Sequence, residues 1–460
     1  MPHRSHGEPL VPWSLVKLRN NQINMTPLYP LLNALSEATP RADRPACPRG
    51  PLQRVIDRFP VLIAIAVLAP RLAVCESYQI SDLGTLGGEY SYACGINDSG
   101  QVVGYSQTTT SHDHAFLYDD GALTDLGTLG GTSSYAYAIN ANHSIVGTTS
   151  LAGERQSHAF VYANGSMRDL GSAGSGSNIV AFAINALGQI AGRYELPDLS
   201  THPFVYSNDV FVDLGTLGGT NGTAYGINNL GEVVGASTIF TNAPWEHAFL
   251  FDTNGIHDLG SLGGYQSAAY AINDAGQAVG YGDDNDYYPH TSIYDSTNGL
   301  QFLGGDFNTA GGAAYGINSL GEVAQAAVDS VAQTTNAYVY SNGNHESLTD
   351  MIPTNSGWNL VEARAINDIG QIAGSGTLRG KTHAFLLTPI RLSTTLSAGG
   401  IVLSWPSALN GFGLQATTNI LGSGWAQITN TPIVVGARNT VTEDTVGSTR
   451  FFRLNKMTGD

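Results

Sequence analysis

The sequence predicts an all-β protein: a seven-bladed β-propeller of four-stranded blades, followed by a small C-terminal β-sandwich module. Three observations support this prediction. Glycine accounts for 56 of the 460 residues and charged residues for only 12%, which indicates many tight turns and few exposed helices. A motif period of about 44 residues runs through the chain. Each period contains four short apolar or alternating segments, which is the pattern of strands.

Four motifs define the period. A segment Asp-Leu-Gly-Thr-Leu-Gly-Gly at 82–88 recurs, complete or decayed, and is followed by an Ile-Asn pair, by variants of Gly-x-Val-Val-Gly and by variants of His-Ala-Phe. Four strands of this kind match one propeller blade. A β-solenoid is the alternative, although its coils are commonly shorter. The seven Asn residues of the Ile-Asn pairs are Asn97, Asn140, Asn185, Asn228, Asn273, Asn318 and Asn367.

The residues after the Ile-Asn pair predict a tight turn. Gly stands three residues after Asn in six of the seven repeats, where a type I turn with a following left-handed residue places it. In the second repeat His143 takes the place of Gly, so we expect a positive φ at His143.

The strand that ends in Ile-Asn is rich in Ala and Gly, so we place it innermost, where strands converge. The predicted order outward is then Gly-x-Val-Val-Gly, His-Ala-Phe and Asp-Leu-Gly. In that order the seventh blade lacks its outer strand. The N-terminal strand 78–83 is expected to supply it by pairing with 382–387, which closes the ring and removes two open edges.

The chain divides by composition into three parts. Residues 1–76 are predicted to be a leader, with a disordered extension and a secretory signal whose apolar segment, 59–69, follows Arg54 and Arg58. That segment is too short to span a membrane; the alternative is an ordinary buried segment. Residues 77–389 form the predicted propeller and 390–460 the C-terminal module. Its five expected strands are 400–406, 411–419, 425–429, 439–442 and 450–454.

These motifs resemble the bacterial HAF extracellular repeat family, named for His-Ala-Phe, over residues 78–390. The resemblance implies a secreted repeat protein with no established activity. The Gly-Gly doublet and the strand order are also kelch-like, although the outer-strand Trp of kelch propellers is absent. Residues 391–460 resemble the fibronectin-III-like C-terminal module of verrucomicrobial and planctomycete secreted proteins. We therefore expect an extracellular protein, released or loosely associated with a surface.

Charge and cysteine content exclude several functions. The net charge is −17, and residues 77–460 contain 11 basic against 32 acidic residues, so nucleic acid is not an expected partner. Cys47 and Cys75 lie in the leader, which leaves Cys94 alone, with neither a disulfide framework nor metal-ligand spacing. We interpret Cys94 as a small buried residue of a strand.

The recurrent polar residues are interpreted as structural and the variable loops as functional. Each His of His-Ala-Phe is expected to make one hydrogen bond within its blade, and each Asp of Asp-Leu-Gly to accept backbone N–H groups. Loops that differ between repeats would share one face of the propeller, as binding loops on a rigid scaffold do.

Two of these loops contain candidate ligand-binding residues. The first contributes Trp245; the second contributes Asp283, Asp284, Asp286, Tyr287 and Tyr288, which could stack on a sugar or hold Ca²⁺. The Asp-rich loop lacks the spacing of a known calcium loop, so the metal stays open and no other cofactor is predicted. Solvated loop residues and packing against a neighbouring blade are the plainer interpretations.

No catalytic constellation is present in the sequence. We therefore predict a non-catalytic, monomeric protein whose variable face binds an extracellular polysaccharide or a surface protein, with no integral membrane domain in the mature form. Two alternatives stay open: a polysaccharide-active hydrolase or lyase, and a purely structural extracellular protein. A hydrolase would need two carboxylates at the central cleft.

Overall fold

The computed structural model describes residues 78–153, 156–173, 176–241, 245–303, 309–329, 334–397, 400–407, 412–418, 425–436, 438–443 and 450–456. The predicted leader (1–76), with its apolar segment 59–69, Cys47 and Cys75, lies outside these residues. Within the described ranges, none of the helices has the length and apolar character needed to cross a membrane. The chain forms two compact units, Tyr78–Pro389 and a second one whose described part falls between Ile390 and Asp460.

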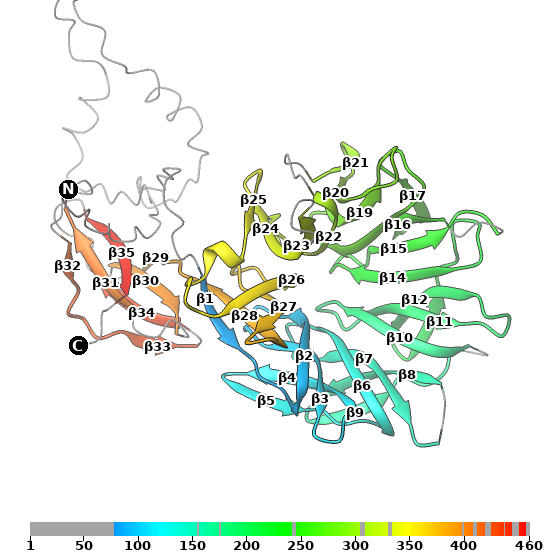
Figure 1. Cartoon of the computed structure of the whole chain (residues 1–460), viewed down its shortest axis with the longest axis horizontal. Helices are drawn as coiled ribbons and strands as arrows, with labels where there is room; N and C mark the ends of the chain where they lie inside the picture. The colour runs from blue at the N-terminus through cyan, green and yellow to red at the C-terminus, as the bar shows by residue number, and fades with distance from the viewer. Residues whose placement is uncertain are drawn as a thin grey trace, which may run out of the picture. The chain divides into compact units, whose positions relative to one another are not determined.

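The first unit is built from four-stranded antiparallel sheets (Figure 1). The first three sheets comprise β2 (Gly87–Ile96), β3 (Val102–Thr108), β4 (Asp113–Asp119) and β5 (Ala122–Asp125); β6 (Gly130–Ile139), β7 (Ile145–Leu151), β8 (Ser157–Ala163) and β9 (Ser166–Asp169); and β10 (Ser177–Ile184), β11 (Ile190–Glu195), β12 (Thr201–Ser207) and β13 (Val210–Asp213).

Three further sheets repeat this order. They comprise β14 (Gly222–Ile227), β15 (Val233–Thr238), β16 (Glu246–Asp252) and β17 (Gly255–Gly260); β18 (Ser267–Ile272), β19 (Ala278–Asp283), β20 (Pro289–Asp295) and β21 (Gly299–Phe302); and β22 (Thr309–Ile317), β23 (Val323–Asp329), β24 (Thr335–Ser341) and β25 (Asn344–Ser347). A short 3₁₀ helix, η1 (Thr349–Met351), precedes the last sheet.

The last sheet combines the two ends of the unit. Its order is β26 (Trp358–Ile366), β27 (Ile372–Leu378), β28 (Lys381–Pro389) and then β1 (Tyr78–Asp82). Tyr78 lies opposite Pro389 and Asp82 opposite Phe385, so the pairing lies further along β28 than the expected 382–387. The first strands of neighbouring sheets contact each other in turn, and β26 contacts β2. The sheets therefore form a closed β-propeller arrangement, and the predicted order of strands within a sheet is confirmed.

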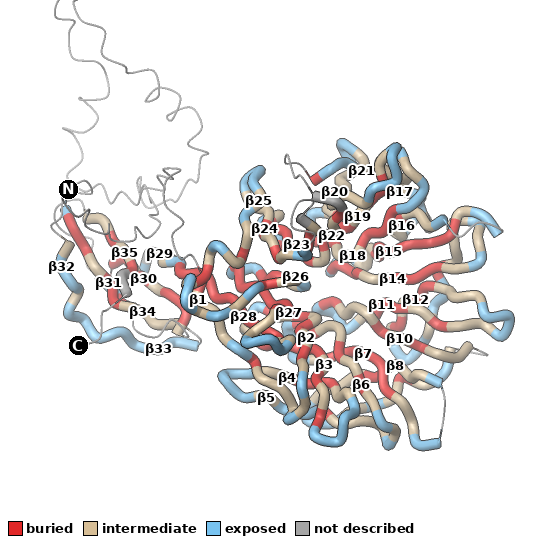
Figure 2. Tube along the Cα trace, viewed as in Figure 1, coloured by how far each residue is buried: buried red, intermediate tan, exposed pale blue. Residues whose placement is uncertain are grey.

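The core lies between successive sheets, while the outermost strands are largely exposed (Figure 2). The Phe of each complete His-Ala-Phe motif is fully buried, as Phe160 shows. Its ring lies against Gly147, the last residue of Gly-x-Val-Val-Gly in that repeat. A Cβ at Gly147 would lie 1.9 Å from the Tyr135 carbonyl oxygen and 2.9 Å from the Phe160 ring, so only glycine fits there.

A belt of seven buried Asn side chains joins the sheets at the end of their first strands; we call it the Asn belt. Each Nδ2 donates to the backbone carbonyl of the equivalent Asn in the next sheet, as in Asn318 to Asn367 (3.1 Å), and Asn367 closes the circle on Asn97 (2.9 Å). The equivalent bonds occur at Asn97, Asn140, Asn185, Asn228 and Asn273. The following turn behaves as expected, and the positive φ predicted for His143 is confirmed at 60°.

The second unit contains two small sheets. One has the order β29 (Ser393–Ser397), β30 (Gly400–Pro406), β34 (Arg438–Glu443), β33 (Ile433–Val435); the other has the order β32 (Ala426–Gln427), β31 (Phe412–Thr417), β35 (Phe451–Lys456). Side chains of both sheets, including Trp405 and Phe452, share one hydrophobic cluster. The sequence analysis did not predict β29 and β33.

Candidate functional site

All the innermost strands share a β-bulge at the same position of the repeat. In β6, Ala136 lies opposite Gly147 and Ala138 opposite Val146, so Tyr137 between them has no opposite residue. The same shift occurs in the other six inner strands. A bulge re-aims the side chain of its extra residue. The seven bulge residues, which we call the bulge belt, are Cys94, Tyr137, Phe182, Tyr225, Tyr270, Tyr315 and Arg364.

The aromatic members of the bulge belt contact one another in order around the centre. Ring centroids of successive members lie 5.2–5.4 Å apart. Arg364 continues the series, because its guanidinium carbon lies 4.2 Å from the centre of the Tyr315 ring. Its Nη2 also lies 2.8 Å from Oε1 of Glu362. The cation is therefore held between an aromatic face and a carboxylate.

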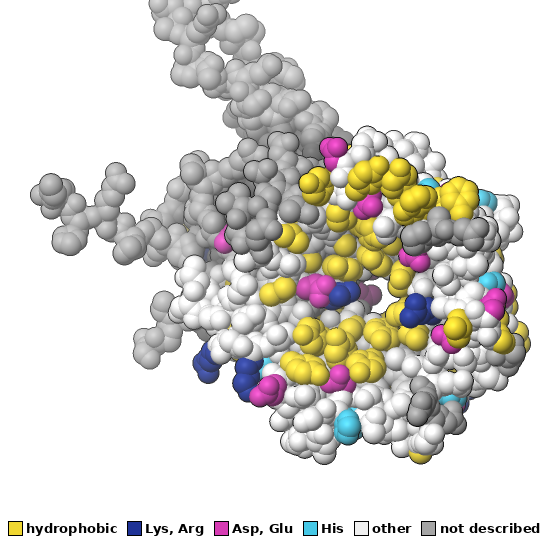
Figure 3. All heavy atoms as spheres, turned by 45° about the vertical axis from the view of Figure 1, so that its right-hand side comes forward, with side chains coloured by type: hydrophobic (Ala, Val, Ile, Leu, Met, Phe, Trp, Pro, Cys, Tyr) yellow, Lys and Arg dark blue, Asp and Glu magenta, His cyan; other side chains and the backbone are white. Residues whose placement is uncertain are grey.

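The bulge belt lines a central pocket of about 230 Å³, together with Tyr92, Ala93, Tyr105 and Glu362. Tyr92 and Tyr105 lie on the side of the belt where the loops between second and third strands emerge, so the pocket belongs to that loop face. Figure 3 shows a hollow ringed by hydrophobic side chains, with acidic and basic side chains at its edge. Aromatic walls with a few polar groups are the usual composition of a ligand site.

Burial controls the ionisation of this region. Desolvation raises the pKa of the Cys94 thiol to about 12, so the thiol is neutral at pH 7 and is not an activated nucleophile. Desolvation also raises the pKa of the Glu246 carboxyl, partly offset by the charge of Arg193. The Glu246 carboxyl, at the start of β16, therefore retains its proton more readily than usual.

The loops of the fourth and fifth sheets bring three exposed aromatic rings into a column. Trp245 and Tyr265 stack with centroids 4.7 Å apart and an angle of 18°, and Tyr265 and Tyr287 stack at 5.0 Å and 19°. Their exposed fractions are 38%, 47% and 57%. The structure thus joins two predicted residues, Trp245 and Tyr287, through Tyr265, which the sequence analysis missed. Tyr288 is exposed beside them but makes no ring contact in the described residues.

Hydrogen bonds within the 283–288 loop and to His290 hold the Asp284 carboxylate in place. Asp284 Oδ1 accepts the backbone N–H groups of Asp286 (2.8 Å) and Tyr288 (3.0 Å), and Oδ2 accepts from His290 Nε2 (2.9 Å). These hydrogen bonds lower the pKa of Asp284, whereas burial raises the pKa of Asp283. Across the described ranges, no three His, Cys, Asp or Glu residues are grouped as metal ligands. The Asp284 carboxylate thus serves the turn that presents Tyr287, and Ca²⁺ binding by Asp283, Asp284 and Asp286 stays a prediction.

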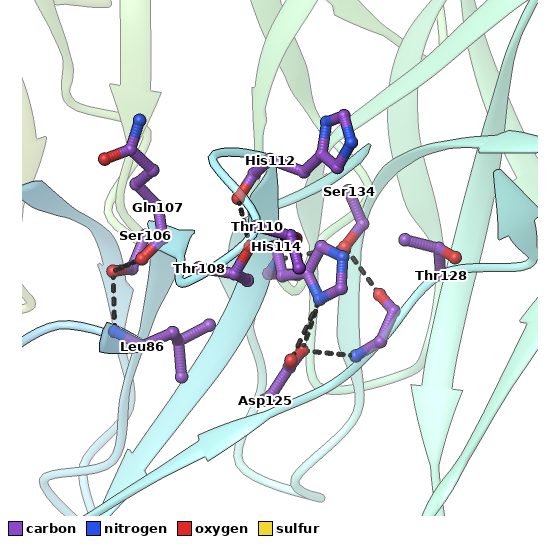
Figure 4. Close-up of polar contacts among 12 residues, drawn as sticks. Leu86, Ser106, Gln107, Thr108, Thr110, His112, His114, Asp125, Thr128 and Ser134 are labelled. Carbon is purple, nitrogen blue, oxygen red and sulfur yellow. Dashed lines mark hydrogen bonds and ion pairs between the residues drawn. The ribbon is translucent and has the colours of Figure 1, made fainter. Parts of the chain in front are cut away.

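The recurrent His and Asp residues bind each other. His114 Nδ1 donates to Asp125, with 2.9 Å to each carboxylate oxygen, and the Gly127 N–H donates to Asp125 Oδ1 at 2.7 Å (Figure 4). Four more repeats have the same pair, including His383 with Asp82 across the closure. The interpretation of both residues as structural hydrogen-bonding groups agrees with this geometry. We call each pair a His-Asp latch.

The bulge belt was not predicted from the sequence, although the sequence contains a signal for it. The residue three positions before the Asn of each Ile-Asn pair is aromatic in five repeats, Arg in one and Cys in one. In a regular strand, this bulge residue would lie on the same face as the residues two positions before and after it. The bulge turns its side chain away from them, and the sequence alone does not reveal the bulge.

Residues 216–421 match the model of a family described as a protein of unknown function, DUF3466. This segment covers the last part of the first unit and enters the second. No curated protein matches the chain in sequence.

Several solved structures are similar at low identity. The β-propeller domain of the Trilobed protease from Pyrococcus furiosus is 10% identical, with a TM-score of 0.40 over 65% of this chain and 93% of that one. The BP39L lectin from Burkholderia pseudomallei is 10% identical, with a TM-score of 0.39 over 71% and 98%. The Pyrococcus horikoshii acylaminoacyl peptidase is 12% identical, with a TM-score of 0.41 over 70% and 58%.

Proposed function

We propose that the chain is a secreted, non-catalytic, seven-bladed propeller whose loop face binds neutral extracellular polysaccharide. The observation that carries this proposal is the exposed column of Trp245, Tyr265 and Tyr287. Contiguous exposed apolar side chains on the loops of a rigid scaffold are characteristic of interaction surfaces. The HAF-type repeats, the leader and the fibronectin-III-like module belong to the same proposal, as parts that export the propeller and hold it near a surface.

The column suits the apolar C–H face of a sugar ring. Its inner ring faces are occupied by one another, which holds the three side chains in place. A ligand therefore has the outer faces of Trp245 and Tyr287 and the ring edges available. Aromatic rings bury a large area at a low cost in side-chain entropy, so two such contacts along a polymer can act together.

Charge favours a neutral polymer over an anionic one. Residues 82–390 contain six Lys and Arg against 29 Asp and Glu, which repels polyanions at low ionic strength. The column itself has no basic side chain among its members. Binding is proposed to be independent of Ca²⁺, because the Asp284 carboxylate is already used by the loop.

The test measures retention of the purified chain on a panel of neutral and acidic insoluble polysaccharides, with and without EDTA. The same samples are assayed for soluble sugar products released from the polysaccharide. We expect retention on a neutral polymer, insensitive to EDTA and reduced at least tenfold by the Trp245→Ala, Tyr287→Ala double variant. Leu320→Ala is the control, since Leu320 is a large exposed apolar residue in a turn at the opposite end of the inner strands. Retention unaffected by the double variant would contradict the proposal.

A glycoside hydrolase is the second candidate, and one observation favours it. Desolvation raises the pKa of Glu246, as a general acid requires, and Glu362, which unlike Glu246 lines the central pocket, is a second carboxylate. Release of shortened products by the wild-type chain, abolished by Glu246→Gln, would establish this alternative and remove the non-catalytic one. Retention without product supports binding alone.

A further inference from the structure

The central pocket presents hydrogen-bond donors that the protein does not use. The hydroxyls of Tyr137, Tyr270 and Tyr315 make no hydrogen bond to any described residue, although all three rings line the pocket. Desolvation raises the pKa of each hydroxyl, so each remains a protonated donor at neutral pH. A polar group buried in a pocket without a protein partner is a group available to a ligand.

The size of the pocket limits what it can hold. Its volume of about 230 Å³ is below the roughly 300–1,000 Å³ of sites for drug-sized molecules, which leaves room for one small ring. A pocket of this size admits one sugar ring, so we expect it to receive the end of a polymer.

The charges of the pocket select an uncharged occupant. Arg364 and Glu362 neutralise each other at 2.8 Å, and Arg364 already covers the ring of Tyr315. A second cation would be repelled by Arg364, and a carboxylate would be repelled by Glu362. What remains favourable is a neutral ring with an apolar face for the aromatic walls and hydroxyls for Arg364, Glu362 and the free tyrosine O–H groups.

From these three features we infer that the central pocket binds the terminal sugar residue of a neutral polysaccharide, one chain end per protein molecule. The inference rests on the proposed function and adds a second, separate site to it. The column of Trp245, Tyr265 and Tyr287 holds the length of the polymer, and the pocket holds its end.

The experiment titrates the full chain calorimetrically with neutral oligosaccharides of one to six residues cut from the retained polysaccharide. The variant is Tyr270→Phe, Tyr315→Phe, which removes two hydroxyls without breaking a protein hydrogen bond and keeps both rings. Tyr294→Phe, a partly buried tyrosine of β20 outside the pocket, is the control. We expect one protein bound per oligosaccharide at every length, and an affinity at least tenfold lower in the double variant only, with unchanged unfolding midpoints.

Other results separate this inference from the proposed function. Oligosaccharide binding that is lost with Trp245→Ala, Tyr287→Ala but retained in the pocket variant overturns the pocket inference and leaves polysaccharide binding intact. Retention of the polymer without any oligosaccharide binding has the same meaning. Displacement of the sugar by tetramethylammonium, with the affinity for that cation lost in Tyr315→Ala, would show a cation cage instead. No retention on any polysaccharide overturns both.

Discussion

The two ends of the propeller axis are made by the same seven inner strands, yet they use side chains differently. At the Asn belt every amide donates to the next sheet and every side-chain oxygen accepts from its own turn, as Asn318 does from the N–H groups of Leu320 and Glu322. Three residues earlier, the aromatic members of the bulge belt contact one another through tilted and edge-on rings, and several of their hydroxyls have no partner in the described residues. The side-chain donors and acceptors of the Asn belt are therefore bonded within the described residues, whereas several hydroxyls of the bulge belt are not.

This difference separates stability from binding. A buried amide with all its partners contributes to the folded state and has nothing left for a ligand. A belt of aromatic rings is stabilised by the contact area of the rings, so it tolerates the loss of a hydroxyl. In the wild-type chain the hydroxyls remain accessible to a ligand. The same repeat thus provides a hydrogen-bonded Asn belt around a pocket of about 300 Å³ at one end and an aromatic belt around a pocket of about 230 Å³ at the other. The substitutions below test that division.

The largest effect is expected at the Asn belt. Asn318→Ala removes bonds to the Asn367 carbonyl (3.1 Å) and to Glu322 (2.9 Å) and leaves buried groups unsatisfied. We expect a loss of about 2–4 kcal/mol in the free energy of unfolding, measured by urea denaturation. Asn344→Ala, at an exposed Asn of β25, is the control and should change stability by less than about 0.5 kcal/mol. Equal losses of unfolding free energy from the two substitutions would contradict a stabilising role of the Asn belt.

A His-Asp latch should have an intermediate effect. Asp258→Ala removes bonds from His247 (2.9 Å) and from the Gly260 N–H (2.7 Å) near the loop face. Because the Asp258 side chain is almost half exposed, we expect a cost of only about 0.5–1 kcal/mol. Thermal or urea unfolding measures it. A loss of unfolding free energy as large as that of Asn318→Ala would show that hydrogen bonds between polar side chains also stabilise the loop end.

Acid should weaken the latches at the loop end. Desolvation of Asp213 opposes its ionisation, but hydrogen bonds from Gly215, His202 and Tyr194 hold its pKa below the usual value. Stability from this group is therefore complete above the unfolded pKa of about 3.9 and is lost as pH falls through the folded value. The stability difference between wild type and Asp213→Asn should shrink below about pH 4. A constant difference from pH 6 to pH 3 would exclude this linkage.

The smallest stability effect is expected in the bulge belt. Tyr270→Phe removes a hydroxyl that bonds to no described residue, so we expect a change below about 0.5 kcal/mol in unfolding free energy. The same denaturation experiment measures it beside Asn318→Ala. A loss above about 1.5 kcal/mol, as for a satisfied buried hydrogen bond, would show that this hydroxyl serves the fold.

Much of the fold could be predicted because its motifs recur. The spacing of the Ile-Asn pairs predicts the repeat, the Ala- and Gly-rich strand predicts the order of strands within it, and the Asn-x-x-Gly turn predicts the positive φ of His143. The pairing of β1 with β28 was predicted, but its register was not. The position of Asp82 opposite Phe385 depends on how the two ends of the unit meet. The strands β29 and β33 carry no repeat and no strong alternation.

The candidate site was less predictable for physical reasons. Trp245 and Tyr287 could be proposed from their loops, but Tyr265 enters the column from the Gly-Gly connection of the next sheet, a contact set by tertiary structure. The Asn residues were interpreted as turn formers, which they are; their second bond, to the neighbouring sheet, spans 43–49 residues of sequence or the whole ring. The orientation of the bulge belt depends on register shifts that composition does not reveal.

The central claim is that the loop face, and not the opposite face, binds polysaccharide. Hydroxyl-radical footprinting with and without the polysaccharide panel tests it directly, because both faces expose oxidisable side chains, Trp245, Tyr265 and Tyr287 on one and Leu187, Leu230 and Leu320 on the other. The account predicts protection of the three aromatic residues by a neutral polymer, with the leucines unchanged. Protection of the leucines alone, or of neither group with any polymer, would contradict it.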